Sequence, residues 1–160
     1  REQSFAERVA WNTAGAVGGV VDNVRFENNG TGVKAIANGQ LTIRNSIVSS
    51  GTQDGINLAA ANGLPLSVTL DRLLVSGNAL AGITSGGAVP VYTTVSRSTV
   101  RGNGGAGVFV SGGTPSETRV TQSTIVRNAT GISAAAGGSM LSRGNNTVEA
   151  NNADGSFSAT

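Results

Sequence analysis

Short apolar runs alternate with small polar residues along the whole chain. Val, Ile and Leu often occupy every second position of a run, and Gly, Asn or Ser interrupts the run after a few residues. Alternation with a period of two predicts half-buried β-strands, and no segment sustains the 3.6-residue period of an amphipathic helix. We therefore expect an all-β protein built from short strands.

The strand pattern itself repeats. The glycine that opens every third strand recurs about every 24 to 25 residues, at Gly32, Gly55, Gly82, Gly107, Gly131 and Gly155. Pro65, Pro90 and Pro115 are 25 positions apart and fall at the same phase of the repeat. Proline donates no hydrogen bond to a strand ladder, so it suits the connections between strands. The prolines thus support the register independently of the glycines.

A repeat of this length indicates a solenoid, a propeller or an array. Each unit contains three short strands, whereas a propeller blade needs four strands and about 40 residues. The sequence therefore predicts a parallel β-helix with about 24–25 residues per coil, in which every coil adds one strand to each of three parallel sheets. We expect it to be right-handed, because crossover connections between parallel strands are almost always right-handed.

The repeat also divides the chain. We expect an N-terminal cap segment followed by a β-helix whose terminal coil is degenerate, with Phe157 covering the end of the stack. The boundaries are residues 1–7 for the cap and 8–160 for the β-helix, with an incomplete first coil at 8–19, five coils at about 20–140 and the degenerate coil at 141–157.

Inward-facing side chains should stack on similar side chains from coil to coil. In the first sheet the inward column is Val21, Ile43, Leu70, Val95 and Val120, and in the third it is Val33, Ile56, Ile83, Val108 and Ile132. For the second sheet we expect a mixed column of Ser46, Leu73, Ser98 and Ser123. The hydroxyls of that column must bond to one another or to the backbone. In the terminal coil, Arg143 falls where a core aliphatic is expected.

One polar residue type dominates the turn between the second and third strands. The turn column is Asn29, Asn78, Asn103, Asn128 and Asn151, with Gly51 in the second coil. Asparagine tolerates the left-handed backbone conformation, and its amide can bond to the same group one coil away. We therefore predict a structural asparagine ladder.

The asparagine column, the Gly-Ile and Gly-Val third strands and the closing run 145–152 resemble the right-handed parallel β-helix family of pectate lyase-like proteins. The resemblance covers about residues 8–155. It implies a bacterial protein that is extracellular, periplasmic or at the cell surface, with saccharide bound across the outer face of one sheet. Lyases of this kind use clustered carboxylates to hold calcium and an arginine to abstract a proton.

The corresponding face here is the outward column of the first sheet together with its adjoining bend. The column is Asp22, Arg44, Asp71, Ser96, Thr121 and Gly144, and we choose as candidate carbohydrate-binding residues Asp22, Arg44, Asp71, Arg72 and Arg97. The alternative is a solvated ladder of salt bridges. Asp22 and Asp71 should be two rungs apart, about 10 Å. That distance is too long for a shared metal ion and marginal for an inverting acid/base pair.

Composition narrows the chemistry further. The 160-residue chain has no cysteine and no histidine, and its formal net charge is only +2. Disulfides are thereby excluded, the commonest metal ligand and general base is missing, and a nucleic-acid partner has little support. We expect no membrane-spanning segment. Glu27, Arg101, Arg127 and Glu149 fall near the second turn, where we interpret them as solubilising charges.

Three functional hypotheses follow. The first is a non-catalytic extracellular or cell-surface module, structural or polysaccharide-binding, with no catalytic residues, metal or cofactor. The second is a polysaccharide lyase or glycoside hydrolase acting on acidic polysaccharide, which would bring a requirement for Ca²⁺ in the lyase case. The third is a solenoid that associates with itself end to end through an open end of the stack, because such an end presents unpaired strand groups.

Overall fold

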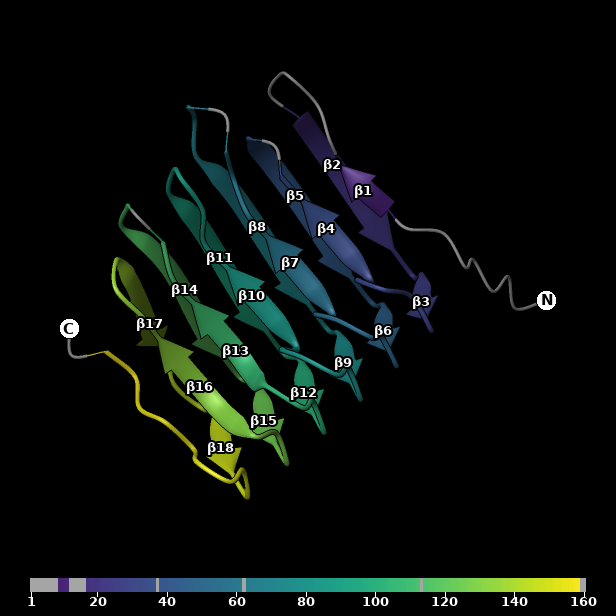
Figure 1. Ribbon diagram of the computed structural model, residues 1–160, viewed down its shortest axis with the longest axis vertical. Helices are drawn as coiled ribbons and strands as arrows, with labels where there is room; N and C mark the ends of the chain where they lie inside the picture. The colour runs from purple at the N-terminus through teal and green to yellow at the C-terminus, as the bar shows by residue number, and fades with distance from the viewer. Residues whose placement is uncertain (1–8, 12–16, 37, 62, 113, 159–160) are drawn as a thin grey trace.

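Each coil of the chain contributes one strand to each of three parallel sheets (Figure 1). The computed structural model describes residues 9–11, 17–36, 38–61, 63–112 and 114–158, and these form strands β1 to β18 and no helix. Neighbours within a sheet are three elements apart in the sequence, as in β2–β5–β8. The prediction of an all-β parallel β-helix with three sheets is confirmed.

The strands are short and fall in three sets. The first sheet consists of β2 (Val17–Asp22), β5 (Gly39–Arg44), β8 (Leu66–Asp71), β11 (Val91–Ser96), β14 (Ser116–Thr121) and β17 (Gly138–Ser142). The second consists of β3 (Arg25–Glu27), β6 (Ile47–Ser49), β9 (Leu74–Ser76), β12 (Thr99–Arg101), β15 (Thr124–Val126) and β18 (Thr147–Glu149). The third consists of β1 (Val9–Trp11), β4 (Val33–Ala35), β7 (Ile56–Leu58), β10 (Ile83–Ser85), β13 (Ala106–Val110) and β16 (Thr130–Ala134).

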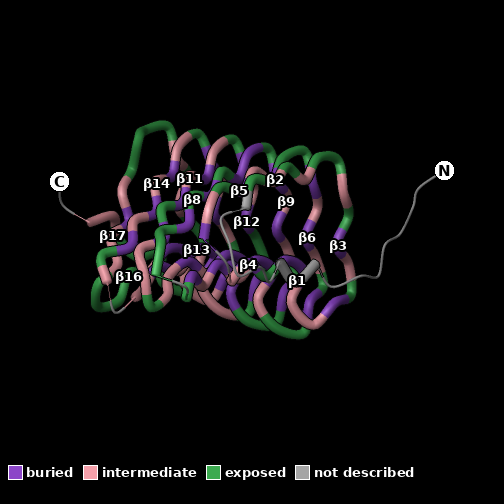
Figure 2. Tube along the Cα trace, turned by 90° about the horizontal axis from the view of Figure 1, so that it is seen from above, coloured by how far each residue is buried: buried purple, intermediate pink, exposed green. Residues whose placement is uncertain are grey.

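The core is a set of aliphatic columns along the axis of the rod. In the first sheet Ile43, Leu70, Val95 and Val120 are fully buried, and in the third sheet the five predicted aliphatics are buried as well. Val21 is only partly buried but packs against this core. Figure 2 shows buried residues recurring from coil to coil along the rod. Period-two alternation on strands of three to six residues thus gives a single continuous interior.

The predicted inward column of the second sheet is buried, but its assignment to the strands was wrong. Ser46, Leu73, Ser98 and Ser123 are buried, but they lie in the bend that precedes each second-sheet strand. The inward residues of the sheet itself are Phe26, Val48, Val75, Val100 and Ile125. Each serine satisfies its hydroxyl on the backbone. Ser98, for example, donates from Oγ to the carbonyl of Ser96 at 2.7 Å and accepts from the amide of Leu73 at 3.1 Å.

The asparagine ladder is present and is almost fully buried. The Oδ1 atom of Asn103 accepts from both the backbone amide and the Nδ2 group of Asn78, at 3.1 and 2.9 Å. Asn128 accepts in the same way from Asn103, and Asn151 from Asn128. Asn29 is the exception, because the next coil carries Gly51 and the buried Nδ2 of Asn29 has no partner among the described residues.

The sequence had led us to expect the left-handed conformation at the ladder asparagines, but these residues do not adopt it. The residue before each of them does. Positive φ angles occur at Asn28, Ser50, Gly77, Gly102, Arg127 and Ala150. This leaves each ladder asparagine free to turn its side chain inward, under the turn, rather than outward to solvent.

The ladder also explains the repeated glycine of the third strand. A Cβ atom on Gly82 would lie 2.8 Å from Nδ2 of Asn103 and 2.7 Å from the carbonyl oxygen of Gly107. A Cβ on Gly107 would meet Asn128 and Gly131 at similarly short distances. Such contacts leave no room for a side chain, so these glycines are required by the close approach of the neighbouring coil.

Residues near the end of the described chain contact the C-terminal coil. Asp154 accepts from the backbone amide and the Nδ2 group of Asn151 at 3.1 and 2.9 Å, and so takes the place of a further ladder asparagine. Ser158 pairs with Met140, donating from its backbone amide at 2.7 Å and accepting through Oγ at 3.0 Å. Phe157 packs against the buried core. Backbone and side-chain groups of the last described residues thus satisfy the terminal coil.

The terminal coil differs in register from the prediction. Its first-sheet strand β17 begins at Gly138 and pairs Ser142 with Val120. Ser142 rather than Arg143 therefore takes the position of the core aliphatic, and it is exposed. The offset is confined to the strand, because Gln122 donates from its amide to the carbonyl of Gly144 at 3.2 Å, as Arg97 does to the carbonyl of Thr121, and Gly144 therefore continues the column of Thr121 at the bend. One more residue separates Ser142 from Thr147 than separates Val120 from Thr124.

At the opposite end, β1 pairs with β4, with Val9 opposite Val33. The expected cap segment, residues 1–7, lies outside the described residues. End-to-end association through the N-terminal end therefore stays a prediction.

We expect Asn103→Ala to lower the free energy of unfolding by about 2–4 kcal/mol, because the change leaves two buried donors of Asn78 without an acceptor. Asn29→Ala is the matched control and should cost less than about 1 kcal/mol, since its Nδ2 group already lacks a partner. Urea unfolding followed by circular dichroism measures both. Equal losses in the two variants would show that the ladder contributes nothing beyond the packing of each side chain.

Candidate functional site

The bend between the first and second sheets has the same backbone geometry in every coil. One residue of each coil has a positive φ between 47° and 57°: Asn23, Asn45, Arg72, Arg97, Gln122 and Asn145. The amide of this residue donates to a carbonyl of the next coil, as from Arg72 to Ser96 at 3.1 Å. The side chains at and just before the bend are therefore held at one edge of the first sheet.

The predicted outward column forms as expected over its first five members. Asp22 pairs with Arg44, Arg44 with Asp71, and Asp71 with Ser96. Thr121 follows Ser96. The two aspartates therefore stand two strands apart, with Arg44 between them. Arg72 and Arg97 follow the column directly at the bend, so all five candidate residues lie along one ridge. We call Asp22, Arg44, Asp71, Arg72 and Arg97 the bend ridge.

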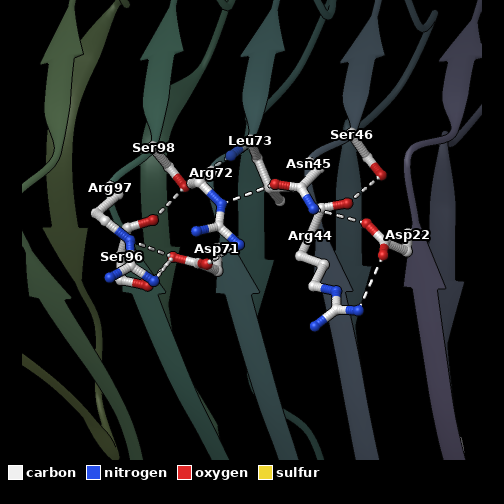
Figure 3. Close-up of polar contacts among 10 residues, drawn as sticks. All are labelled: Asp22, Arg44, Asn45, Ser46, Asp71, Arg72, Leu73, Ser96, Arg97 and Ser98. Atoms are coloured by element: carbon white, nitrogen blue, oxygen red, sulfur yellow. Dashed lines mark hydrogen bonds and ion pairs between the residues drawn. The ribbon is translucent and has the colours of Figure 1, made fainter.

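Asp22 is the first anion of the bend ridge (Figure 3). Its Oδ2 atom lies 2.9 Å from a terminal nitrogen of Arg44, and its Oδ1 accepts from Nδ2 of Asn45 at 2.7 Å. Asn45 in turn accepts from Nε of Arg72 at 2.7 Å. Asn45 therefore connects Asp22 to the next coil. The sequence pattern did not identify this bridging role of Asn45, which depends on its side-chain direction.

Asp71 is the second anion and is much more enclosed, with 6% of its surface exposed. Its Oδ1 atom accepts from Oγ of Ser96 at 2.7 Å, from Nε of Arg97 at 2.9 Å and from a terminal nitrogen of Arg97 at 2.7 Å. Its Oδ2 atom lies 3.3 Å from Arg72. The bend ridge is thus one connected network over four coils, as Figure 3 shows.

These contacts keep both carboxylates ionised. The hydrogen bond from Arg97 lowers the pKa of Asp71 below its usual value, although burial acts in the opposite direction. The hydrogen bonds from Asn45 and Arg44 lower the pKa of Asp22. Conversely, the hydrogen bond to Asp71 and its charge raise the pKa of Arg97. None of these shifts moves a group toward neutral pH, where a general acid or base is most effective.

The guanidinium groups remain accessible in spite of their ion pairs. The side chains of Arg44, Arg72 and Arg97 are 46%, 51% and 53% exposed. The side chains of the two aspartates are less exposed, at 39% for Asp22 and 9% for Asp71. The ridge therefore presents mainly guanidinium hydrogen-bond donors to solvent, and the less exposed carboxylates hold these groups in place.

Another acidic residue, Asp54, lies outside the bend ridge. The turn residue Asp54 makes local contacts, accepting from the amide of Ala81 at 3.0 Å and from Asn57 at 2.9 Å. Within the described ranges, no group of three or more His, Cys, Asp or Glu side chains is arranged to hold a metal ion. The described part of the chain also contains no helix with the length and hydropathy needed to cross a membrane.

Comparison with known proteins gives one match. A protein-family model described as a right handed beta helix region matches residues 12–153. No curated protein and no solved structure matches the chain. The family match agrees with the right-handed prediction and with the described coils, and it carries no assignment of substrate or activity.

Asp71→Asn tests the charge of the enclosed carboxylate. Because the folded pKa of Asp71 lies below its unfolded value of 3.8, the stabilisation is complete well above that pH and is lost as the pH falls through the folded pKa. We expect Asp71→Asn to lower the free energy of unfolding by about 1–3 kcal/mol at pH 7. The difference from the wild type should shrink toward pH 2.

Urea unfolding at several pH values makes this measurement. Asp22→Asn is the control, and its exposed carboxylate should produce a smaller loss at pH 7. A gap between the wild type and Asp71→Asn that stays constant from pH 7 to pH 2 would contradict the stabilising role of the charge.

Proposed function

The chain belongs to the right-handed β-helix family, and we propose that it is a non-catalytic module that binds acidic polysaccharide outside the cytoplasm or at the cell surface. The bend ridge is the proposed binding surface. One observation carries the proposal: two carboxylates fix three guanidinium groups in place, and about half of each arginine side chain stays exposed.

The charge of the ridge supports an anionic ligand. Its three arginines and two aspartates sum to +1 (3 − 2). A guanidinium is a planar fork of five N–H donors that matches a carboxylate in two parallel hydrogen bonds. Arg97 uses Nε and one terminal nitrogen on Asp71, which leaves its other terminal nitrogen for a ligand. Because the protein already holds these groups, a ligand loses less side-chain entropy on binding.

The spacing of the ridge suits a linear polymer. Arg44, Arg72 and Arg97 come from three successive coils. Successive coils of a parallel β-helix are about 4.8 Å apart. A chain of uronic acids laid along the ridge would meet several guanidinium groups in turn, and each further contact raises the effective concentration for the next.

Backbone strain also supports a role for these arginines. Arg72 and Arg97 have φ angles of 52° and 47°, in the left-handed region, where three other coils have the better suited Asn23, Asn45 and Asn145 and one has Gln122. A residue other than glycine or asparagine costs on the order of 1 kcal/mol there. Long cationic side chains at this cost are expected where they contribute to binding.

The ionisation of the ridge favours binding over catalysis. A glycosidase needs a carboxylic acid with a raised pKa to protonate the leaving group. Here the pKa values of Asp22 and Asp71 are lowered. A lyase needs a base, and the raised pKa of Arg97 makes it a poorer one. The lyase alternative, with its calcium requirement, and the hydrolase alternative therefore have less support.

We expect the protein to bind pectate or alginate more tightly than a neutral polysaccharide such as dextran, measured by affinity electrophoresis. Arg72→Gln and Arg97→Gln should each weaken binding roughly fivefold, as expected for a partly exposed charge pair. Binding should also weaken as the salt concentration rises, because added ions screen exposed charges.

Arg143→Gln is the matched control, since Arg143 is exposed in the terminal coil and forms no ion pair among the described residues. Circular dichroism verifies that each variant is folded. Equal affinity for acidic and neutral polymers, or unchanged affinity in the double variant of Arg72 and Arg97, would overturn the proposal and leave a structural rod.

Incubation with pectate and alginate, with and without Ca²⁺, separates binding from turnover. We expect no unsaturated or shortened product, because the pKa values of Asp22 and Asp71 are lowered and that of Arg97 is raised, away from the range that proton transfer at neutral pH requires. Product that disappears in Asp71→Asn would establish the enzyme alternative instead.

A further inference from the structure

A shallow hollow lies at the other edge of the second sheet, at the turn that leads to the third. It has a volume of about 260 Å³ and is lined by Ser50, Ser76, Gly77, Arg101, Gly102 and Arg127. The three-residue strands of the second sheet separate it from the bend ridge, a distance of about 10 Å. None of its residues belongs to that ridge.

The hollow exists because two successive coils lack a side chain at the same position of the turn. Gly77 and Gly102 have φ angles of 65° and 63°, and the coils on either side carry Ser50 and Arg127 there. A Cβ atom on Gly102 would meet nothing within 4 Å. Unlike the third-strand glycines, these two therefore leave open space, with serine on one side and arginine on the other.

Two cations border the space without a protein partner. Arg101 ends β12, and Arg127 follows β15, the neighbouring strand. Both are exposed, and neither forms a salt bridge or side-chain hydrogen bond within the described residues. By contrast, five other arginines have a carboxylate partner: Arg25, Arg44, Arg72, Arg97 and Arg119.

The placement of Arg127 adds a second anomaly. Its φ of 56° is left-handed, at a position where other coils have Asn, Ser, Gly or Ala. The chain thus accepts both backbone strain and the repulsion of two like charges on adjacent coils. A solubilising role explains the charge, but it does not explain why the two arginines border a hollow with serine hydroxyls.

We propose that this hollow binds an oxyanion group, a carboxylate or a sulfate. Arg101 and Arg127 supply the charge-assisted hydrogen bonds. The hydroxyls of Ser50 and Ser76 supply neutral donors, and the bare backbone of Gly77 and Gly102 lets the anion approach closely. The site does not depend on the polysaccharide proposal for the bend ridge. Its anion comes either from a free ion or from an acidic group of a polymer.

Nuclear magnetic resonance titration of the ¹⁵N-labelled protein with sodium sulfate, and separately with sodium galacturonate, tests the site. We expect saturable shifts of the Gly77 and Gly102 amides and of the Arg101 and Arg127 Nε–Hε signals with at least one of these anions. A parallel titration with dextran sulfate, with dextran as the neutral control, identifies the source. Tighter binding per sulfate group by the polymer indicates a polymeric ligand, and equal binding indicates a free ion.

Three variants complete the test. Arg101→Gln and Arg127→Gln should each weaken sulfate or galacturonate binding about fivefold or more. Gly102→Asn keeps a residue that tolerates the left-handed conformation but fills the hollow, so it should abolish the shifts in a folded protein. Arg143→Gln should leave binding unchanged, and so should Arg72→Gln, which tests independence from the bend ridge.

Shifts that increase linearly without saturation for both anions would overturn the proposal. So would saturable binding that survives the double change of Arg101 and Arg127 to Gln, or a loss in Arg143→Gln as large as in Arg101→Gln. If the bend ridge binds no acidic polysaccharide while the hollow still binds the anion, the proposed function is refuted and the anion site is not.

Discussion

The close approach of successive coils at the second turn sets the geometry of the whole rod. There the asparagine amide of one coil bonds to the amide of the next, and the third-strand glycine of one coil lies against the asparagine amide of the next. Neither residue type works without the other: a side chain on Gly82 would collide with the amide of Asn103. Because this turn repeats with little variation, the coils stack in register, and every other position of the repeat is placed opposite its counterpart one coil away.

Because the coils stack in register, residues that repeat in the sequence form columns on the surface. The bend ridge and the hollow lie at the two edges of the same short sheet, and both are made by what successive coils place at equivalent positions. At the bend, carboxylates fall beside arginines, and the network is internally compensated. At the hollow, glycines and unpartnered arginines fall together. The same sheet thus has arginines paired with carboxylates at the bend ridge and arginines beside open space at the hollow.

Much of this followed from the sequence, because the repeat reports register directly. The aliphatic columns of the first and third sheets, the asparagine ladder and the alignment of Asp22, Arg44 and Asp71 depend only on period and alternation. The errors have a different origin. Whether Asn28 or Asn29 takes the left-handed conformation, and whether Ser46 lies in a strand or a bend, depends on turn geometry that a period does not encode.

Other features depend on single side-chain directions or single residues. The bridge made by Asn45 requires its amide to point along the rod, and the role of Asp154 requires a local turn beyond the last repeat. The strand β17 is offset by one residue, and an extra residue before β18 restores the spacing, so pattern matching misplaced Arg143. Repeats are therefore most predictable in the middle of the stack and least at its end.

The direction of the asparagine ladder gives the rod an electrical polarity. The Nδ2 groups of Asn78, Asn103 and Asn128 each donate toward the C-terminal coil, and their Oδ1 atoms accept from the N-terminal side. The amide dipoles consequently add head to tail, whereas the strand dipoles of a sheet largely cancel. Their positive end is at Asn151, where the final acceptor is the carboxylate of Asp154. An α-helix is stabilised in the same way by an acidic residue at its positive N-terminus, so this solenoid terminates its ladder with the charge that its own field favours.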